Sequence, residues 1–400
     1  MSGTYLLGVF NDSFYKEAAI LLAFAAGMSE LQSPIIKYFS LPFILFSGVA
    51  GYLADRFAKR NVVIASKYME LAAMGLGAMG ILTGSFPLVL AMVFTMALQS
   101  TLFSPALNGS IPESFHETEV PRVNALLKMI TTVSIIVGIV LAGIVLDLHL
   151  PALKLNGKAL TAAVIIAVSL IGVVSAHRLI RVAPHSPTQK PSFLWIGPLQ
   201  SVRDTISLRS SPRLLKALLL STFFYFTSTL VLAAVHELSL TDLGFSSSFT
   251  SALSGIIAIG VAAGSIFSIR LSKRFSFEQI FFPAAVLFGT ALIIASLSAL
   301  HPIGSTELHL ATALFVTGAA GGAFLIPLLT YIQVTPVATE KGKILGINNF
   351  LDFLGIFIAG ELFGRLHPRI EASTLLAGTG AFSLATAALF IIPKKENSHV

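Results

Sequence analysis

The stretch YLLGVFNDSFYKEAAILLAFAA, residues 5–26, is apolar over a length that can cross a bilayer, yet it holds Asn11, Asp12, Lys16 and Glu17. A spanning helix needs about 20 predominantly apolar residues. An ionisable group near the bilayer centre costs several kcal/mol, so it usually faces a partner or a wet cavity and marks a transport path. Asp12 and Lys16 are four residues apart, on one helical face, where they can neutralise each other.

The composition excludes a soluble domain. Of 400 residues, 55% are hydrophobic and 11% are charged, against about 25% charged in ordinary soluble domains. The net charge of +7 is dispersed among short loops, whereas nucleic-acid binding needs clustered Lys and Arg. The chain has no cysteine, which excludes a disulfide framework, a thiolate metal site and a Cys nucleophile.

Roughly twelve apolar runs are long enough to span a membrane. They lie at 5–26, 33–53, 62–83, 86–108, 121–146, 159–178, 214–235, 248–269, 278–300, 308–331, 343–364 and 372–392. The longest polar gap contains five prolines and scattered basic residues, as a linker does. We therefore predict an all-α membrane protein with a six-helix bundle at 1–178, a cytoplasmic linker at 179–213 and a second six-helix bundle at 214–400.

The placement of Lys and Arg predicts the orientation. With both termini in the cytoplasm, the inside loops and the tail hold eighteen of these residues and the outside loops hold four. The N-terminus has no basic region and no small-residue cleavage site, so we expect the first helix to be retained as a span.

The two halves resemble each other. A shift of 214 positions lays RFAKR (56–60) on RLSKR (270–274), and a shift of about 222 lays LFSPAL on FLIPLL. A shift of 224 pairs Asn124 and Lys128 with Asn348 and Asp352. Nearly equal offsets indicate internal duplication, which is typical of parallel six-helix repeats in transporters.

The loop GYLADRFAKR, residues 51–60, resembles the loop signature of the major facilitator superfamily. The resemblance implies the facilitator fold and a gating latch, in which Asp55 and Arg56 stabilise one access state. Arg60 can hold the loop at the anionic inner leaflet. In the second half Ile269 replaces the acid. The alternative is that these charges only set the topology.

Three further stretches are similar to the lysophospholipid transporter family and to the transporter halves of fused acyltransferase proteins. They are GVFNDSFYK (8–16), KYMELAAMG (67–75) and LQSTLFSPALNGSIPE (98–113). The second half matches mainly at GINNFLDFLG (346–355). At Lys128, where the family more often has an acid, the charge has changed sign, and Asp352 is its possible complement.

The resemblance implies roles for polar residues within the spans. Those implied to contact substrate are Asn11, Asp12, Lys16, Lys128, Asn348 and Asp352. Those implied to gate are Asp55, Arg56, Arg60, Lys67, Glu70 and Asn124. The structural alternatives are a self-neutralised Asp12–Lys16 pair, a Lys67–Glu70 pair within one bundle, and Asn side chains that only join neighbouring helices.

The function that the resemblance implies is movement of lysophosphatidylethanolamine-like lipid across a bacterial inner membrane by alternating access. The Phe-rich face at 223–226 could line the acyl tail. We expect a monomer that contacts membrane lipids and supplies a cytoplasmic acyltransferase. The alternatives are a proton-coupled exporter of amphipathic drugs, with Asp12 or Asp352 as the proton-binding carboxylate, and a non-transporting tether for an acyltransferase.

An enzyme is not expected. The sequence has no G-x-S-x-G elbow, and GVAAGS (260–265) lacks the lysine of a phosphate loop. No His-x-x-x-His spacing for a metal occurs, so we expect no catalytic residue, no metal, no cofactor and no nucleic-acid partner.

Overall fold

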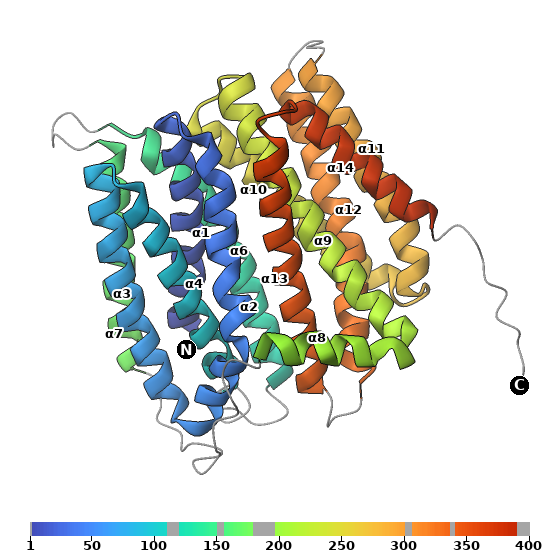
Figure 1. Ribbon diagram of the computed structural model, residues 1–400, viewed down its shortest axis with the longest axis horizontal. Coiled ribbons are helices and arrows are strands. Elements are labelled where there is room, and N and C mark those ends of the chain that lie inside the picture. The colour runs from blue at the N-terminus through green and yellow to red at the C-terminus, as the bar shows by residue number, and fades with distance from the viewer. Residues whose placement is uncertain are drawn as a thin grey trace, which may run out of the picture.

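Long helices make up the chain, and Figure 1 shows them in a computed structural model. The structure describes residues 2–109, 120–149, 156–178, 197–300, 306–336 and 341–389. A helix satisfies its backbone hydrogen bonds internally, which hydrocarbon cannot do for it. The helices of the first half are α1 (Ser2–Ala25), α2 (Gln32–Arg56), α3 (Lys59–Thr83), α4 (Phe86–Gly109), α6 (Val120–Asp147) and α7 (Gly157–His177). Those of the second half are α9 (Pro212–Glu237), α10 (Ser247–Leu271), α11 (Phe277–Leu300), α12 (Thr306–Val334), α13 (Lys341–Leu366) and α14 (Ala372–Ala388).

Each predicted apolar run falls on one of these helices. In the described part of the chain, ten helices are long and apolar enough to cross a membrane. Of the other two, α1 has 24 residues and carries Asp12, Lys16 and Glu17, and α14 has 17 residues. The prediction of an all-α membrane protein is confirmed.

The first-half helices stand on one side of Figure 1 and the second-half helices on the other, and α8 (Gly197–Ser207) lies across the lower part of α13. This short helix lies within the stretch predicted as a linker and packs against both α2 and α13. We call the end of the molecule that α8 crosses the α8 face. The opposite end, where α1, α9 and α13 finish and α2 and α10 begin, is the far face.

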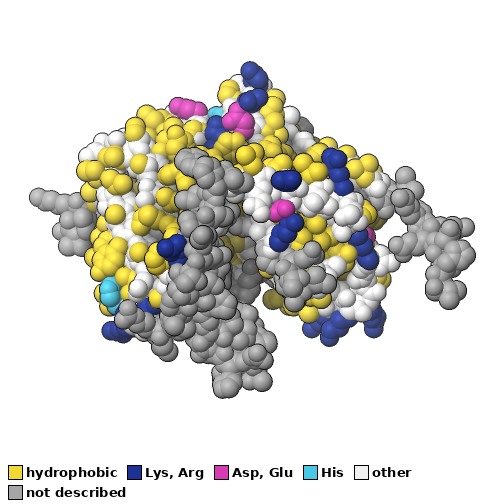
Figure 2. All heavy atoms as spheres, turned by 60° about the horizontal axis from the view of Figure 1, so that its bottom comes forward, with side chains coloured by type: hydrophobic (Ala, Val, Ile, Leu, Met, Phe, Trp, Pro, Cys, Tyr) yellow, Lys and Arg dark blue, Asp and Glu magenta, His cyan; other side chains and the backbone are white. Residues whose placement is uncertain are grey.

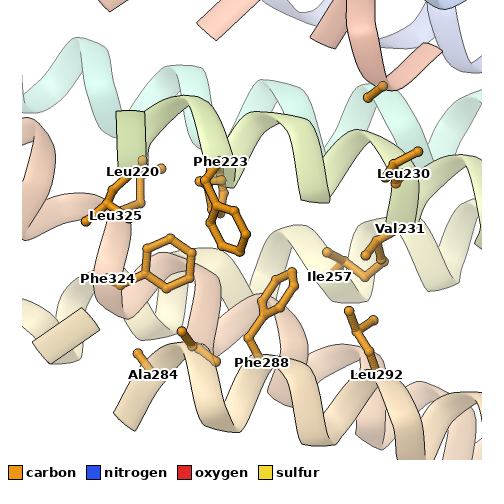
Figure 3. Packing of buried hydrophobic residues seen from close by; sticks show 14 of the residues in the cluster. Leu220, Phe223, Leu230, Val231, Ile257, Ala284, Phe288, Leu292, Phe324 and Leu325 are labelled. Carbon is orange, nitrogen blue, oxygen red and sulfur yellow. The ribbon is translucent and has the colours of Figure 1, made fainter. Parts of the chain in front are cut away.

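Aromatic side chains fill the core of the second half, as Figure 3 shows around Phe223, Phe288 and Phe324. Phe324 lies 5.7 Å from Phe224 and 5.2 Å from Phe281 between ring centroids. Phe223 and Phe224 are therefore buried core residues, which corrects the expectation that the whole run lines an acyl tail. Tyr225 and Phe226 of the same helix are only partly buried.

A close helix contact in the second half joins α10 to α12 through paired glycines. Gly260 and Gly264 of α10 face Gly318 and Gly322 of α12, in small-xxx-small patterns that let two backbones approach. A Cβ added at Gly264 would lie 1.8 Å from the carbonyl oxygen of Ala319. Because that atom belongs to the backbone, the helices would have to separate to make room.

We predict that Gly264→Ala destabilises the protein. The added methyl group forces α10 from α12, and overpacking of this kind costs about 1–3 kcal/mol. The midpoint of thermal unfolding in detergent should fall. The matched control is Gly378→Ala on α14, where an added Cβ meets nothing within 4 Å, and its midpoint should not fall. Equal midpoints for the two variants would contradict the packing described.

Candidate functional site

Neighbouring residues of α1 face different helices, and this separates two groups of polar side chains. Asn11 is fully buried and donates from Nδ2 to Glu70 Oε1 on α3 at 2.9 Å. Asp12, one residue on, accepts from Ser100 Oγ of α4 at 2.7 Å and is partly exposed. Successive residues of a helix point about 100° apart, so one turn of α1 serves both groups.

The first group is a sealed network inside the first half. Lys67 donates to Glu70 Oε2, and both side chains are fully buried. Lys67 Nζ also lies 4.8 Å from the ring centroid of Phe103. Gly8 leaves the space that this ammonium group occupies, because a Cβ there would come within 2.9 Å of Nζ. Both charges are therefore neutralised in place, without contact with the space between the halves.

The second group begins with Asp12 and Lys16. Among the described residues no ion pair joins them, so the structural alternative of a self-neutralised Asp12–Lys16 pair does not hold. Asp12 Oδ1 is buried and has no hydrogen-bond partner in the described part of the chain. Lys16 is partly exposed, and its Nζ lies 4.8 Å from the ring centroid of Phe39 on α2. The Asp12 carboxylate can therefore accept further hydrogen bonds, and the Lys16 ammonium group can donate them.

Aromatic rings connect this group to the second half. Phe353 of α13 stacks on Phe43 of α2 with ring centroids 3.9 Å apart and an interplanar angle of 4°. The Phe353 ring also lies 6.3 Å from Phe39, the ring beneath Lys16. We call Phe39, Phe43 and Phe353 the shared aromatic cluster. Lys16 and α13 thus meet the same cluster from opposite halves.

Asp352, next to Phe353 in the chain, repeats the arrangement seen at Asp12. Its Oδ2 accepts from Asn348 Nδ2 at 2.7 Å and from Ser221 Oγ of α9 at 3.2 Å. Its Oδ1 is buried without a hydrogen-bond partner among the described residues. Each of the two carboxylates is thus held through one oxygen by a serine of another helix, and each leaves the other oxygen unbonded.

Some predicted site residues lie elsewhere or outside the described side chains. The side chains of Asp55, Asn124 and Lys128 are not among those that the structure describes. Arg60 donates from Nη2 to the carbonyl oxygen of His177 at 2.9 Å, which joins α3 to the end of α7. The guanidinium carbon of Arg56 lies 5.8 Å from the ring centroid of Phe57.

The two halves are held together at the far face. Among the described residues, every side-chain hydrogen bond between the halves comes from this part of the molecule. The polar pairs include Glu17 with His236 at 2.9 Å, Glu17 with Ser251 at 3.3 Å, Asp147 with Ser248 at 2.6 Å, Lys37 with Glu361 at 2.8 Å, Ser33 with the Gly360 carbonyl at 2.8 Å and Ser29 with His367 at 3.3 Å. The far face is therefore closed.

The α8 face has a different connection. Here Lys343 of α13 pairs with Asp204 of α8 at 2.9 Å, and Gly48 of α2 lies against Gly197 at the start of α8. The ends of α2 and α13 are bridged through α8 on this side. No group of three His, Cys, Asp or Glu residues that could hold a metal occurs in the parts of the chain that the structure describes.

A family model described as Major Facilitator Superfamily matches residues 4–360. The chain belongs to the major facilitator superfamily. This facilitator is 25% identical over 98% of its length to the lysophospholipid transporter LplT of Escherichia fergusonii, covering 94% of that protein. It is 26% identical to the protein of the same name from Citrobacter koseri, with the same two coverages. The predicted resemblance to the lysophospholipid transporter family is confirmed.

Solved structures confirm the facilitator fold. The crystal structure of a D-xylose-proton symporter superposes with a TM-score of 0.75 at 12% identity, covering 100% of this facilitator and 99% of that chain. A POT family transporter in complex with 5-aminolevulinic acid superposes with a TM-score of 0.73 at 14% identity, covering 98% and 94%.

Sequence reasoning missed the partners of the charged residues. Ser100 lies inside a family-like stretch, but nothing in its spacing indicates that it binds Asp12. Glu17 was visible as an ionisable residue in an apolar run, whereas its partner His236 is 219 positions away. The separation of 219 falls within the repeat offsets of 214 to 224 positions, so the two residues lie on the corresponding helices α1 and α9, but the repeat does not indicate that their side chains meet. Only the packing of one half on the other brings them together.

We predict that Glu361→Gln loosens the far face of this facilitator. The neutral side chain no longer pairs with Lys37, so the open state gains population. The chain has no native cysteine, so a single reporter, Ser33→Cys, can be labelled with a membrane-impermeant maleimide. Its labelling rate should rise roughly two- to fivefold. The control is Glu307→Gln, an exposed acid at the start of α12. Identical rates in the two backgrounds would contradict a closing role for Glu361.

Proposed function

We propose that this facilitator is a lysophospholipid transporter that works by alternating access. The observation that carries the proposal is the pair of incompletely bonded carboxylates, Asp12 and Asp352, on helices of opposite halves. Lys16, four residues from Asp12, contacts Phe39 of the shared aromatic cluster, and Phe353 of the same cluster is the chain neighbour of Asp352. A site of this composition suits a ligand that carries charges of both signs and an apolar chain.

Lysophosphatidylethanolamine has these features. Its ammonium group can pair with the carboxylate of Asp12 or with that of Asp352, each of which has an unbonded Oδ1, and its phosphate can accept from Lys16, which donates to no described residue. The rings of Phe39, Phe43 and Phe353 can pack against the glycerol and the first part of the acyl chain. Asn348 positions Asp352 through its hydrogen bond. The names of the full-length relatives support the same substrate class.

The residues that the resemblance implies to contact substrate do not all have surroundings that suit this role. Asn11 is fully buried and bonded to Glu70, so we assign it with Lys67 and Glu70 to the framework of the first half. Asp55, Arg56, Arg60 and Asn124 stay proposed as gating residues, and Lys128 stays proposed as a substrate contact.

The protein would alternate between two states, one closed at the far face and the other closed at the α8 face. We propose that the α8 face is cytoplasmic and that both termini lie there, in a bacterial inner membrane. Figure 2 turns the α8 face forward and shows Lys and Arg gathered at several points on it, in keeping with the positive-inside rule. The bundles at 1–178 and 214–400 would rock about the shared aromatic cluster, joined by the linker at 179–213.

The product of inward movement is a phospholipid that lacks one acyl chain. We propose that a cytoplasmic acyltransferase consumes it, and that the transporter acts as a monomer surrounded by membrane lipids. We propose that the lipid moves inward, toward that acyltransferase.

Transport by purified protein in liposomes tests the proposal. Wild-type protein should move fluorescent lysophosphatidylethanolamine and be inhibited by unlabelled lysophosphatidylethanolamine. Lys16→Met should weaken competition by every lysophospholipid, because all share the phosphate. Asp12→Asn should weaken competition by the ethanolamine lipid about tenfold, the effect of losing roughly one charge-assisted contact, and affect lysophosphatidylglycerol less.

Lys158→Met is the matched control, because Lys158 is exposed near the start of α7. Its competition profile should equal that of wild type. Failure of wild-type protein to move any lysophospholipid would overturn the proposal. Proton-driven movement of amphipathic drugs instead would favour the exporter, and no movement of either would favour the tether.

A further inference from the structure

Each half carries an apolar pocket on three helices, at positions that the internal repeat relates. In the first half a pocket of about 290 Å³ lies among α2, α3 and α4. In the second half a pocket of about 560 Å³ lies among α10, α11 and α12. The shift of 214 positions carries the lining residues Leu53, Phe57 and Met69 onto lining residues of the second pocket, namely Phe267, Leu271 and Pro283. We call the second pocket the α10–α12 slot.

The shape of the slot follows from its small residues. Ala263, Ala319 and Ala323 line it, and the paired glycines behind them bring α10 and α12 together. The rims are larger side chains that are well exposed, Phe267 at 57% and Leu287 at 49%. In a helix bundle within a bilayer, exposed apolar rims face lipid acyl chains. The slot is therefore open at the surface of the second half, and none of its lining residues belongs to the shared aromatic cluster.

Basic residues follow the slot at the α8 face. Arg270, Lys273 and Arg274 are exposed and lie within three residues of the lining residues Phe267 and Leu271. Helical neighbours three or four apart share a face, so Arg270 continues the wall formed by Phe267. In the described part of the chain, no ion pair engages these three residues.

Among the described residues, the acids that could neutralise this cluster are missing from the repeat position or engaged elsewhere. The repeat position that holds Asp55 in the first half holds Ile269 here, with 57% of its surface exposed. Glu278, at the start of α11, accepts two hydrogen bonds from Arg213 at 2.8 and 3.1 Å. A group of positively charged side chains therefore lies directly beside the end of the apolar slot.

We infer that the α10–α12 slot binds one anionic phospholipid from the leaflet at the α8 face. One acyl chain lies in the slot, and the headgroup phosphate accepts hydrogen bonds from Arg270, Lys273 and Arg274. Near a membrane surface, basic side chains favour anionic lipid in proportion to their number. The inference concerns a bound lipid on the outside of the second half and does not depend on which substrate passes between the halves.

Lipid retention by the purified full-length protein tests the inference. The protein in detergent is titrated with phosphatidylglycerol, with phosphatidylcholine, and with glycerol 3-phosphate as a headgroup without chains, and native mass spectrometry reports bound molecules. We expect one phosphatidylglycerol to be retained in preference to phosphatidylcholine, and no retention of glycerol 3-phosphate.

Three variants separate charge from shape. Arg270→Gln with Arg274→Gln should weaken phosphatidylglycerol retention about tenfold and leave phosphatidylcholine unchanged. Ala263→Leu with Ala323→Leu fills the slot and should abolish preferential retention of phosphatidylglycerol. The control, Arg203→Gln with Arg209→Gln, removes two exposed positive charges from α8 and the turn after it and should behave as wild type.

The result that overturns the inference is an equal loss of phosphatidylglycerol in the charge variant and the control, since that indicates only general attraction to a basic face. Full retention in the slot-filled variant, or binding of glycerol 3-phosphate alone, would also overturn it. Circular dichroism and the melting temperature of each variant establish that it is folded, and a slot-filled variant that does not fold is replaced by Ala263→Leu alone.

Discussion

Hydrocarbon does not solvate charge, and this constraint shapes the surroundings of the ionisable side chains that the structure describes within the spanning helices. Lys67 and Glu70 neutralise each other completely and gain a further hydrogen bond from Asn11. Asp12 and Asp352 are each held through one oxygen only. An incompletely bonded carboxylate in such surroundings is costly unless a ligand or water completes it. Glu70 of the framework is bonded through both oxygens, whereas each carboxylate of the proposed site is bonded through one.

The arrangement of the halves follows from two kinds of contact. Polar pairs such as Lys37 with Glu361 close the far face, while ring stacking between Phe43 and Phe353 holds α2 against α13 nearer the proposed site. Polar pairs can exchange partners with water, whereas the stacked rings can slide against each other without losing a specific hydrogen bond. The same helices can therefore separate at one end and stay in contact in the middle, which is what alternating access requires.

The sequence predicted the helices well because each span must be apolar and long, and these properties are local. The family was also predictable, since loop and helix motifs such as 51–60 and 8–16 are local patterns. Partners across the fold were not predictable. The four-residue spacing of Asp12 and Lys16 suggested a pair. Instead, Asp12 accepts a hydrogen bond from Ser100 of α4, and Lys16 lies over the ring of Phe39 of α2. Likewise, the sequence does not show which residues of the run at 223–226 are core residues and which are partly buried, because this depends on how α9 packs against its neighbours.

The most direct test compares Asp12→Asn with Lys67→Met in two measurements, affinity for lysophosphatidylethanolamine and melting temperature. We expect Asp12→Asn to bind lysophosphatidylethanolamine about tenfold more weakly than wild type. Its melting temperature should be unchanged or higher, because a costly buried carboxylate is removed. Lys67→Met should melt several degrees lower, because Glu70 stays buried and unpaired, yet bind normally while folded. Full affinity in Asp12→Asn together with lost affinity in folded Lys67→Met would contradict the account.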